Sequence, residues 1–296
     1  MRTCIVAHAP CLDGYAASRL LFRTLSTEHT TIVDWNLRPD TLDKEVLKAS
    51  QVIYFVDCCP SPALVDELAE NAQQIVIVDH HETNEKAINA SRVALRGNVV
   101  RHFNNTLCAT ELVCDYFVST EQPWYVQHIG DGDLWRWKHK DSKAIVRALS
   151  VPLDLERLDQ MNEDERRELV LRGEALLATD EAVVTTLAAT REFIDVFFEN
   201  EWHRAAWLRL SRGFSDYRLL SDLGSRVANN VAIALLIDEH DKVSTRHNAM
   251  DNSVKPLHCG NFCKQFGGGG HAAAAGCTIK GAYEHGLVGE HFRRNT

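Results

Sequence analysis

The chain has 296 residues and a formal net charge of −9, with 45% hydrophobic and 25% charged residues. This length can provide the cores of two domains, and the composition excludes a disordered or fibrous protein. An acidic chain lacks the broad positive field that holds long nucleic-acid duplexes. Any nucleic-acid ligand is therefore expected to be short, or held by a local basic patch.

The nine cysteines are odd in number and form no paired C-x-x-C knuckles, which argues against a structural zinc site. We expect reduced thiols in a cytoplasmic compartment. The sequence has no recognisable secretory signal and no run of about 18 apolar residues. No membrane span or membrane partner is therefore expected.

The first half of the chain alternates short apolar runs with helical patterns. The pattern predicts strands at residues 3–8, 30–33, 52–56 and 74–78, and helices at residues 14–25, 42–49 and 63–72. Continuous apolar strands separated by helices form parallel sheets that are covered on both faces. The expected fold class is therefore α/β, with an N-terminal parallel sheet.

The second half is expected to begin with helices and to end with a smaller α/β domain. The pattern predicts a helix at residues 107–117 and a helical connector at residues 153–207. It then predicts a hairpin of two strands, at residues 231–237 and 242–246. A glycine and alanine cluster occupies residues 267–276. We place the domain boundary near residue 190, which gives domains of residues 1–190 and 191–296.

Polar side chains occur where the predicted strands of the first domain end. His8 ends the first strand, Asp57 follows the third, and Asp79, His80 and His81 follow the fourth. Ligands of an open parallel sheet bind outside the carboxyl ends of its strands. One aspartate at such a place is commonly a helix cap or a turn former. Three strand ends that each carry Asp or His instead predict a metal site.

Further carboxylates lie near these strand ends in the sequence. Asp13 stands five residues after His8, and Asp131 and Asp133 lie in the segment Ile-Gly-Asp-Gly-Asp-Leu-Trp. Asp and His ligands without paired cysteines suit Mn²⁺ or Mg²⁺. Two such ions about 3.5–4 Å apart generate a hydroxide and neutralise a phosphate. The residues therefore predict a two-ion phosphate chemistry.

The cluster at residues 267–276 reads Gly-Gly-Gly-Gly-His-Ala-Ala-Ala-Ala-Gly. Successive glycines expose backbone N–H groups that together fit an anion. His271 can add a hydrogen bond or a positive charge, and the following alanines allow a close-packed helix. Arg246 on the preceding hairpin can pair with phosphate, although one arginine alone is more often a surface residue.

These motifs resemble a known family. Asp79-His80-His81 resembles the signature of the DHH phosphoesterase superfamily, and residues 267–276 resemble the GGGH-x-x-AAG motif of its C-terminal associated domain. The superfamily includes single-strand exonucleases, oligoribonucleases, cyclic-dinucleotide phosphodiesterases and adenosine 3′,5′-bisphosphate phosphatases. Its pyrophosphatases and exopolyphosphatases carry a different second domain. The resemblance implies a phosphodiesterase of exonuclease type that uses two Mn²⁺ or Mg²⁺ ions.

The resemblance also implies the metal ligands and the place of the site. His8 would bind one ion and Asp13 the other, and Asp57 would bridge both. Either Asp131 or Asp133 could complete the second ion's shell, and we favour Asp131. The implied ligands are thus His8, Asp13, Asp57, His80 and Asp131. The active site would lie in a cleft between the two domains.

Substrate contacts are implied on both domains. Asp79 would orient the metal shell through hydrogen bonds, and His81 would face the substrate phosphate. The second domain would hold the rest of the substrate through Arg246, Gly268, Gly269, Gly270 and His271.

The first motif departs from the family pattern His-x-x-x-Asp-x-Asp. It is one residue shorter, and Cys11 stands where the first aspartate would fall, as in a Cys-x-Asp-Gly variant. Cys11 either binds metal as a thiolate or is a small buried apolar residue. Trp135 and Trp137 either stack on a base or pack in the core.

The expected substrate is a short single-stranded oligonucleotide or a small nucleotide. One alternative keeps the chemistry and changes the substrate to a cyclic dinucleotide or adenosine 3′,5′-bisphosphate. Another is a nucleotide-binding regulator without catalysis, and a third is a polyphosphatase. The oligomeric state stays open, with a homodimer among the options.

Overall fold

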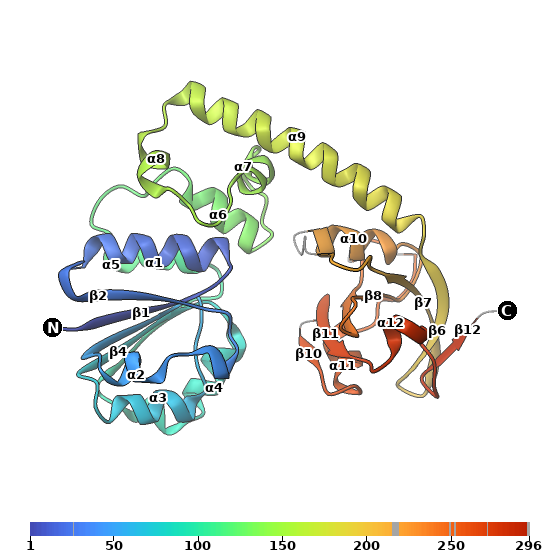
Figure 1. Cartoon of the computed structure of the whole chain (residues 1–296), viewed down its shortest axis with the longest axis horizontal. Coiled ribbons are helices and arrows are strands. Elements are labelled where there is room, and N and C mark those ends of the chain that lie inside the picture. The colour runs from blue at the N-terminus through green and yellow to red at the C-terminus, as the bar shows by residue number, and fades with distance from the viewer. Residues whose placement is uncertain (26, 215–218, 249, 252, 271, 295–296) are drawn as a thin grey trace. The chain divides into compact units, whose positions relative to one another are not determined.

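The computed structural model describes residues 1–25, 27–214, 219–248, 250–251, 253–270 and 272–294. The chain divides into two compact units, Met1–Leu177 and Ala178–Thr296 (Figure 1). This division falls inside helix α9 (Glu163–Ala188), whereas the boundary expected from the sequence lies just after that helix. His271 lies outside the described residues.

The first unit contains a sheet of five parallel strands in the order β2-β1-β3-β4-β5. The strands are β1 (Thr3–His8), β2 (Thr30–Trp35), β3 (Val52–Val56), β4 (Gln74–Asp79) and β5 (Val99–Phe103). The predicted α/β class with an N-terminal parallel sheet is confirmed. Strand β5 was not predicted, because its sequence Val-Val-Arg-His-Phe is too polar to resemble the other buried strands.

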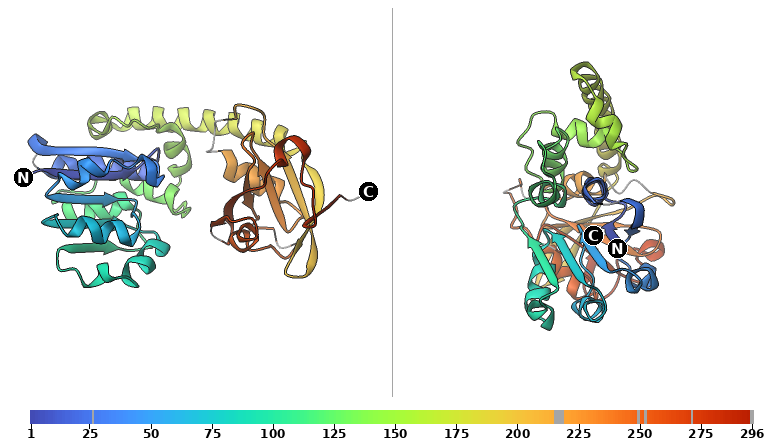
Figure 2. Two further views of the ribbon diagram at one scale, coloured as in Figure 1. Left: turned by 60° about the horizontal axis from the view of Figure 1, so that its bottom comes forward. Right: turned by 90° about the vertical axis from the view of Figure 1, so that its left-hand side faces the viewer.

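Helices cover both faces of this sheet, as Figures 1 and 2 show. The first five are α1 (Leu12–Thr24), α2 (Lys44–Lys48), α3 (Pro62–Ala69), α4 (Glu82–Asn89) and α5 (Ala109–Phe117). Alternate side chains of β3 point to opposite faces, so Val56 packs with α1 and α5 while Phe55 packs with α3. Burial on both faces explains why the strands are continuously apolar.

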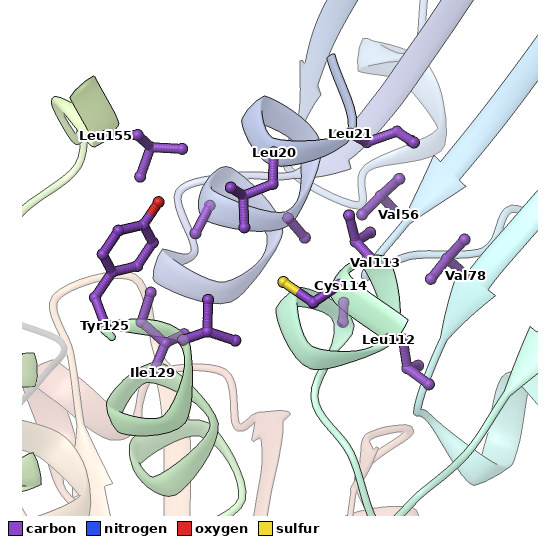
Figure 3. Packing of buried hydrophobic residues seen from close by; sticks show 14 of the residues in the cluster. Leu20, Leu21, Val56, Val78, Leu112, Val113, Cys114, Tyr125, Ile129 and Leu155 are labelled. Carbon is purple, nitrogen blue, oxygen red and sulfur yellow. The ribbon is translucent and has the colours of Figure 1, made fainter. Parts of the chain in front are cut away.

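Three short helices follow α5 in the first unit: α6 (Val126–Asp133), α7 (Ser142–Ala148) and α8 (Leu155–Gln160). Figure 3 shows Tyr125 and Ile129, at and beyond the start of α6, packed in the same cluster as Leu20 of α1 and Leu112 of α5. This packing fixes α6, whose last residue is Asp133, against the helices beside the sheet.

The second unit contains a mixed sheet of seven strands in the order β10-β11-β9-β8-β7-β6-β12. Strands β7 and β8 are parallel, and the other neighbours are antiparallel. The strands are β6 (Glu192–Phe198), β7 (Glu201–Arg209), β8 (Ile233–Ile237), β9 (Lys242–Arg246), β10 (Gly269–Gly270), β11 (Ala274–Thr278) and β12 (Phe292–Arg294). The predicted hairpin of β8 and β9 is confirmed.

Two predictions for the second unit were wrong. The helical connector does not reach residue 207, because α9 ends at Ala188 and β6 and β7 form a hairpin. In β6 every second residue is buried, and the turn residues Glu199 and Asn200 both have positive φ, as a tight hairpin requires. The alanine run forms no helix, and its last two residues, Ala274 and Ala275, begin strand β11, which pairs with β9.

Helices α10 (Leu219–Val227), α11 (Cys259–Lys264) and α12 (Ala282–His285) complete the second unit. Its core has separate clusters on the two faces of the sheet, with Leu235 in one and Leu236 in the other. None of the helices in the described part of the chain has the length and apolar character of a membrane span.

Candidate metal centre

The carboxylate of Asp57 lies between two histidines at the carboxyl edge of the first sheet. Its Oδ2 is 3.2 Å from Nδ1 of His8, and its Oδ1 is 3.1 Å from Nε2 of His80. Asp57 is 2% exposed and has a left-handed φ of 57°, a conformation that aspartate tolerates better than most residues. The ends of β1, β3 and β4 thus meet because these strands are neighbours in the sheet.

Burial and the neighbouring polar groups shift the pKa values of Asp57 and His80 in opposite directions. Burial raises the pKa of Asp57, but hydrogen bonds from His8 and His80 outweigh it and hold that pKa well below its usual range. Burial lowers the pKa of His80, but Asp57 and the neighbouring Asp133 and Asp13 raise it to about 9. Without a cation, the imidazolium of His80 therefore offsets part of the negative charge of these carboxylates.

Asp13 reaches the same place from the first turn of α1. Its carboxylate accepts two hydrogen bonds from the start of α5, from Ala109 N at 2.7 Å and from Thr110 N at 2.8 Å. Oδ2 of Asp13 also lies 3.9 Å from Nε2 of His80. Burial and the charge of Asp57 raise the pKa of Asp13, although the bonds from α5 oppose this. Asp13 thus joins α1, α5 and the histidine cluster.

Asp133 supplies the carboxylate that α6 brings to this cluster. Its Oδ2 lies 3.4 Å from Nε2 of His80 and has no hydrogen-bond partner among the described residues, although the atom is buried. Burial and the charges of Asp13 and Asp57 raise the pKa of Asp133 to about 8. A buried oxygen without a partner, aimed at other ligand atoms, fits a metal ion.

Asp131, which the sequence analysis favoured over Asp133, does not join the cluster. Its Oδ2 accepts hydrogen bonds from His139 N and Ser142 Oγ, both at 2.8 Å, and its Oδ1 lies 3.5 Å from Nε of Arg136. Residues two apart on a helix face nearly opposite directions. Asp131 therefore fixes the loop between α6 and α7, and Asp133 takes its place beside His80.

Asp79 holds the turn that carries the two histidines. Its Oδ1 accepts hydrogen bonds from His80 N at 2.8 Å and His81 N at 3.2 Å, and lies 2.7 Å from Nδ1 of His81. Its Oδ2 accepts from Asn84 Nδ2 at 2.6 Å. The bond to Asp79 raises the pKa of His81. Asn84 was not predicted as a site residue, although its place on the first turn after His81 was a usable signal.

Ligand atoms in this part of the chain form three overlapping groups, and the atoms of each group lie within 4.8 Å of one another. Asp57 and His80 each belong to two of them, as the shared ligands of neighbouring ions would. The cluster therefore has the donor atoms of a divalent metal site. The groups are Asp57, Asp79, His80 and His81; His8, Cys11 and Asp57; and Asp13, His80 and Asp133.

Gly14 explains one further feature of the first motif. A Cβ atom at this position would lie 2.5 Å from the carbonyl oxygen of His8 and 3.0 Å from Oδ2 of Asp57. Only glycine lets α1 begin this close to the end of β1. The close approach brings Asp13 to the cluster around Asp57 and His80.

Trp135 and Trp137 follow Asp133 in the loop after α6. Both have left-handed backbones, with φ of 53° and 48°, and their ring centroids are 5.8 Å apart in an edge-to-face arrangement. Trp135 is 56% exposed, so it is not a core residue. The alternative of a stacking surface for a base therefore remains for Trp135.

The glycine-rich segment of the second unit forms backbone hydrogen bonds with neighbouring segments of the same unit. Gly268 donates its amide to the carbonyl of Cys263 at 3.0 Å, so this amide is not available to a phosphate as the sequence analysis expected. Gly269 pairs with Gly276, and Gly270 has a φ of 142°, which favours glycine. The glycines therefore serve the close approach of β10 to β11.

Arg246 ends β9 in the same unit and is half-buried. Its Nη1 donates to the carbonyl of Thr245 at 2.8 Å, while its buried Nε has no partner among the described residues. Burial lowers the pKa of Arg246. A guanidinium group with donors to spare is consistent with phosphate binding.

Comparison with known proteins identifies part of the second unit. Residues 217–287 match the DHHA1 domain. No curated protein is a significant match to the sequence. The match confirms the DHH-associated domain, and with it the resemblance to the DHH superfamily of phosphoesterases.

Three solved structures resemble the chain loosely. An uncharacterised protein from Helicobacter pylori G27 has 15% identity and a TM-score of 0.42, with 95% of this chain and 94% of that chain covered. An exopolyphosphatase-related protein from Bacteroides fragilis has 14% identity and a TM-score of 0.48, with 95% and 87% covered. The pGpG-specific phosphodiesterase PggH from Vibrio cholerae has 14% identity and a TM-score of 0.47, with 94% and 93% covered. Likeness at this level does not transfer a neighbour's substrate to this chain.

Proposed function

We propose that the protein is a metal-dependent phosphodiesterase that hydrolyses short oligonucleotides or small nucleotides. The observation that carries the proposal is the carboxylate of Asp57, whose two oxygens each lie within 3.2 Å of a ring nitrogen of a different histidine, His8 or His80. A carboxylate so placed can bridge two ions. The DHHA1 domain supports the same class of reaction.

The residues divide into two groups of ligands around Asp57. His8 and Asp57 would hold one ion, and Asp13, His80 and Asp133 would complete the shell of the other. Bound Mn²⁺ or Mg²⁺ supplies an activated water and neutralises charge on the phosphate. Asp133 thus replaces Asp131 in the ligand set that we propose.

Side chains of the protein would position the substrate's phosphate groups through hydrogen bonds. Nδ1 of His81 is engaged by Asp79, which fixes the ring and leaves Nε2 to face the substrate. The bond to Asp79 raises the pKa of His81, which favours the protonated ring that would donate a hydrogen bond to a phosphate oxygen. In the second unit, Arg246 would bind another phosphate group of the substrate.

The charge of the protein supports a short substrate. A net charge of −9 disfavours long nucleic acids, which are held through many phosphate contacts. The exposed ring of Trp135, two residues beyond Asp133, can stack on a base without selecting its identity. Cyclic dinucleotides and adenosine 3′,5′-bisphosphate offer the same chemistry and stay within this proposal.

The test is a panel of substrates incubated with Mn²⁺, with Mg²⁺ or with EDTA. It contains a labelled dinucleotide, a cyclic dinucleotide, adenosine 3′,5′-bisphosphate and tripolyphosphate. We expect metal-dependent cleavage of a nucleotide, abolished in Asp57→Asn and retained in the control Asp115→Asn, whose side chain is exposed on α5. Nucleotide binding without turnover supports a regulator, and cleavage of tripolyphosphate alone contradicts the nucleotide substrate.

A further inference from the structure

Cys11 occupies an unusual position for a cysteine without a chemical role. It immediately precedes α1 at the N-cap position, and the backbone amide of Gly14 lies close to its sulfur. Its sulfur, a ring nitrogen of His8 and a carboxylate oxygen of Asp57 all lie within 4.8 Å of one another. Three different ligand types thus converge on one place.

The surroundings of Cys11 do not suit a small apolar residue. Burial and the nearby carboxylates of Asp57, Asp13 and Asp133 raise the pKa of its thiol, so the sulfur keeps its proton as long as no cation is bound. Cys4 and Cys58, by contrast, belong to the apolar cluster on one face of the sheet, whereas none of the apolar clusters of the described residues includes Cys11. Packing alone therefore does not explain a sulfur at this place.

We propose that Cys11 is a metal ligand, so that one ion of the centre is bound by imidazole, thiolate and carboxylate. This inference rests on the proposed metal-dependent function and adds the identity of one ligand and the class of its ion. The Cys11 S–H bond breaks as the sulfur–metal bond forms, and the proton leaves to solvent. No oxidation or reduction is involved.

The sulfur gives the group around His8 a different metal preference from the group around Asp133. Thiolate and imidazole favour borderline ions such as Zn²⁺, Co²⁺ or Fe²⁺, whereas Mg²⁺ prefers oxygen ligands. The other group, Asp13, His80 and Asp133, contains no sulfur and suits Mn²⁺ or Mg²⁺. The centre would thus hold two chemically different ions, with the softer one next to His8.

Titration of the metal-free protein with Co²⁺ tests the ligand without measuring activity. A thiolate bound to Co²⁺ produces a charge-transfer band in the near ultraviolet. We expect this band in the wild type and its loss in Cys11→Ser. The matched control is Cys59→Ser, because the half-buried Cys59 thiol donates to the carbonyl of Pro60 at 3.4 Å. That variant should keep the band.

Affinity and thiol protection give two further readouts. Removing a direct ligand should weaken Zn²⁺ binding at least about tenfold, since even outer-shell changes cost that much. Cys11→Asp should restore binding without the band and shift the preference toward Mn²⁺. Zn²⁺ should also protect Cys11 from iodoacetamide, as peptide mass spectrometry would measure. Circular dichroism checks that each variant is folded.

Two outcomes overturn the inference: a band that persists in Cys11→Ser, or equal alkylation of Cys11 with and without saturating Zn²⁺. Failure here is distinct from failure of the proposed function. Hydrolysis that requires metal, with no band, refutes only the thiolate ligand. A band that depends on Cys11, without hydrolysis of any substrate, supports the ligand and refutes the phosphodiesterase.

Discussion

Replacing Asp133 by asparagine should stabilise the protein when no metal is bound. The carboxyl group is 22% exposed and lies beside Asp13 and Asp57, and burial with these charges raises its pKa from 3.8 to about 8. Between pH 3.8 and about 8, Asp133 therefore keeps a proton in the folded chain that it has lost in the unfolded chain. The group's contribution to stability is therefore present at low pH and is lost as the pH rises through about 8.

The size of the effect follows from proton linkage. One such group lowers the free energy of unfolding by about 1.4 kcal/mol for each pH unit, or about 2.7 kcal/mol between pH 5.5 and 7.5. Partial exposure and local relaxation reduce this figure, so we expect a loss of about 1–2 kcal/mol in the wild type. His80, whose pKa is raised to about 9, acts in the same direction above its ordinary pKa of 6.5.

Urea denaturation in EDTA at pH 5.5, 6.5 and 7.5 measures this prediction. Asp133→Asn should be more stable than the wild type at pH 7.5, by about 1–2 kcal/mol, with a flatter pH dependence. It should also lose the stabilisation that Mn²⁺ gives the wild type. Asp115→Asn serves as the control and should follow the wild type. Equal pH slopes for the wild type and Asp133→Asn would refute the reasoning.

Three further substitutions test other parts of the first unit. Gly14→Ala should lower stability by about 1–3 kcal/mol and weaken Mn²⁺ binding, because its Cβ would lie 2.5 Å from the His8 carbonyl oxygen. Thermal denaturation with and without Mn²⁺ measures both effects. Asp131→Ala should cost about 1–3 kcal/mol by leaving His139 N without its acceptor and Ser142 Oγ with only Nδ1 of His128, with Mn²⁺ affinity nearly unchanged in calorimetry. Trp135→Ala should raise the KM for a dinucleotide by about 5- to 100-fold, since stacking contributes about 1–3 kcal/mol per base.

Each of these predictions has an outcome that contradicts it. An alanine at position 14 that leaves both stability and Mn²⁺ binding intact would mean that α1 can move away from β1. Loss of Mn²⁺ binding in a folded Asp131→Ala variant would restore Asp131 as a ligand. An unchanged KM after truncation of Trp135 would exclude base stacking. Trp202→Ala is its control, because Trp202 is also exposed, at 40%, but lies in the second unit.

The sheet of the first unit was predictable because its strands are buried on both faces. Strands β1, β3 and β4 appear in the sequence as largely apolar runs, and each ends at or just before a polar residue. In β6 the charged Asp195 interrupts the apolar run, β7 begins with Glu201, Trp202, His203 and Arg204, and the surrounding glutamates and alanines suggested a helix. The pairing of β6 with β7 and β12 overrides that local preference.

The choice between Asp131 and Asp133 could not be made from the sequence. Both lie on the last turn of α6, and the face that each occupies depends on how α6 packs through Val126 and Ile129. Gly268 illustrates the same limit, because four successive glycines suit an anion loop as well as a close backbone approach. The structure shows that the Gly268 amide donates a hydrogen bond to the carbonyl of Cys263, five residues earlier, and the sequence does not reveal this contact.

Strand register explains why the donors of three separate βα units form one centre. Ala7 pairs with Val56, and Val56 pairs with Val78, so the residues that follow these three form a row across the edge of the sheet. The row is His8, Asp57 and Asp79. A shift of one residue in β3 would move Asp57 by about 3.3 Å and direct its side chain to the other face. Phe55 and Val56 pack into cores on opposite faces of the sheet, which fixes the register of β3. The same register therefore places the carboxylate of Asp57 between His8 and His80.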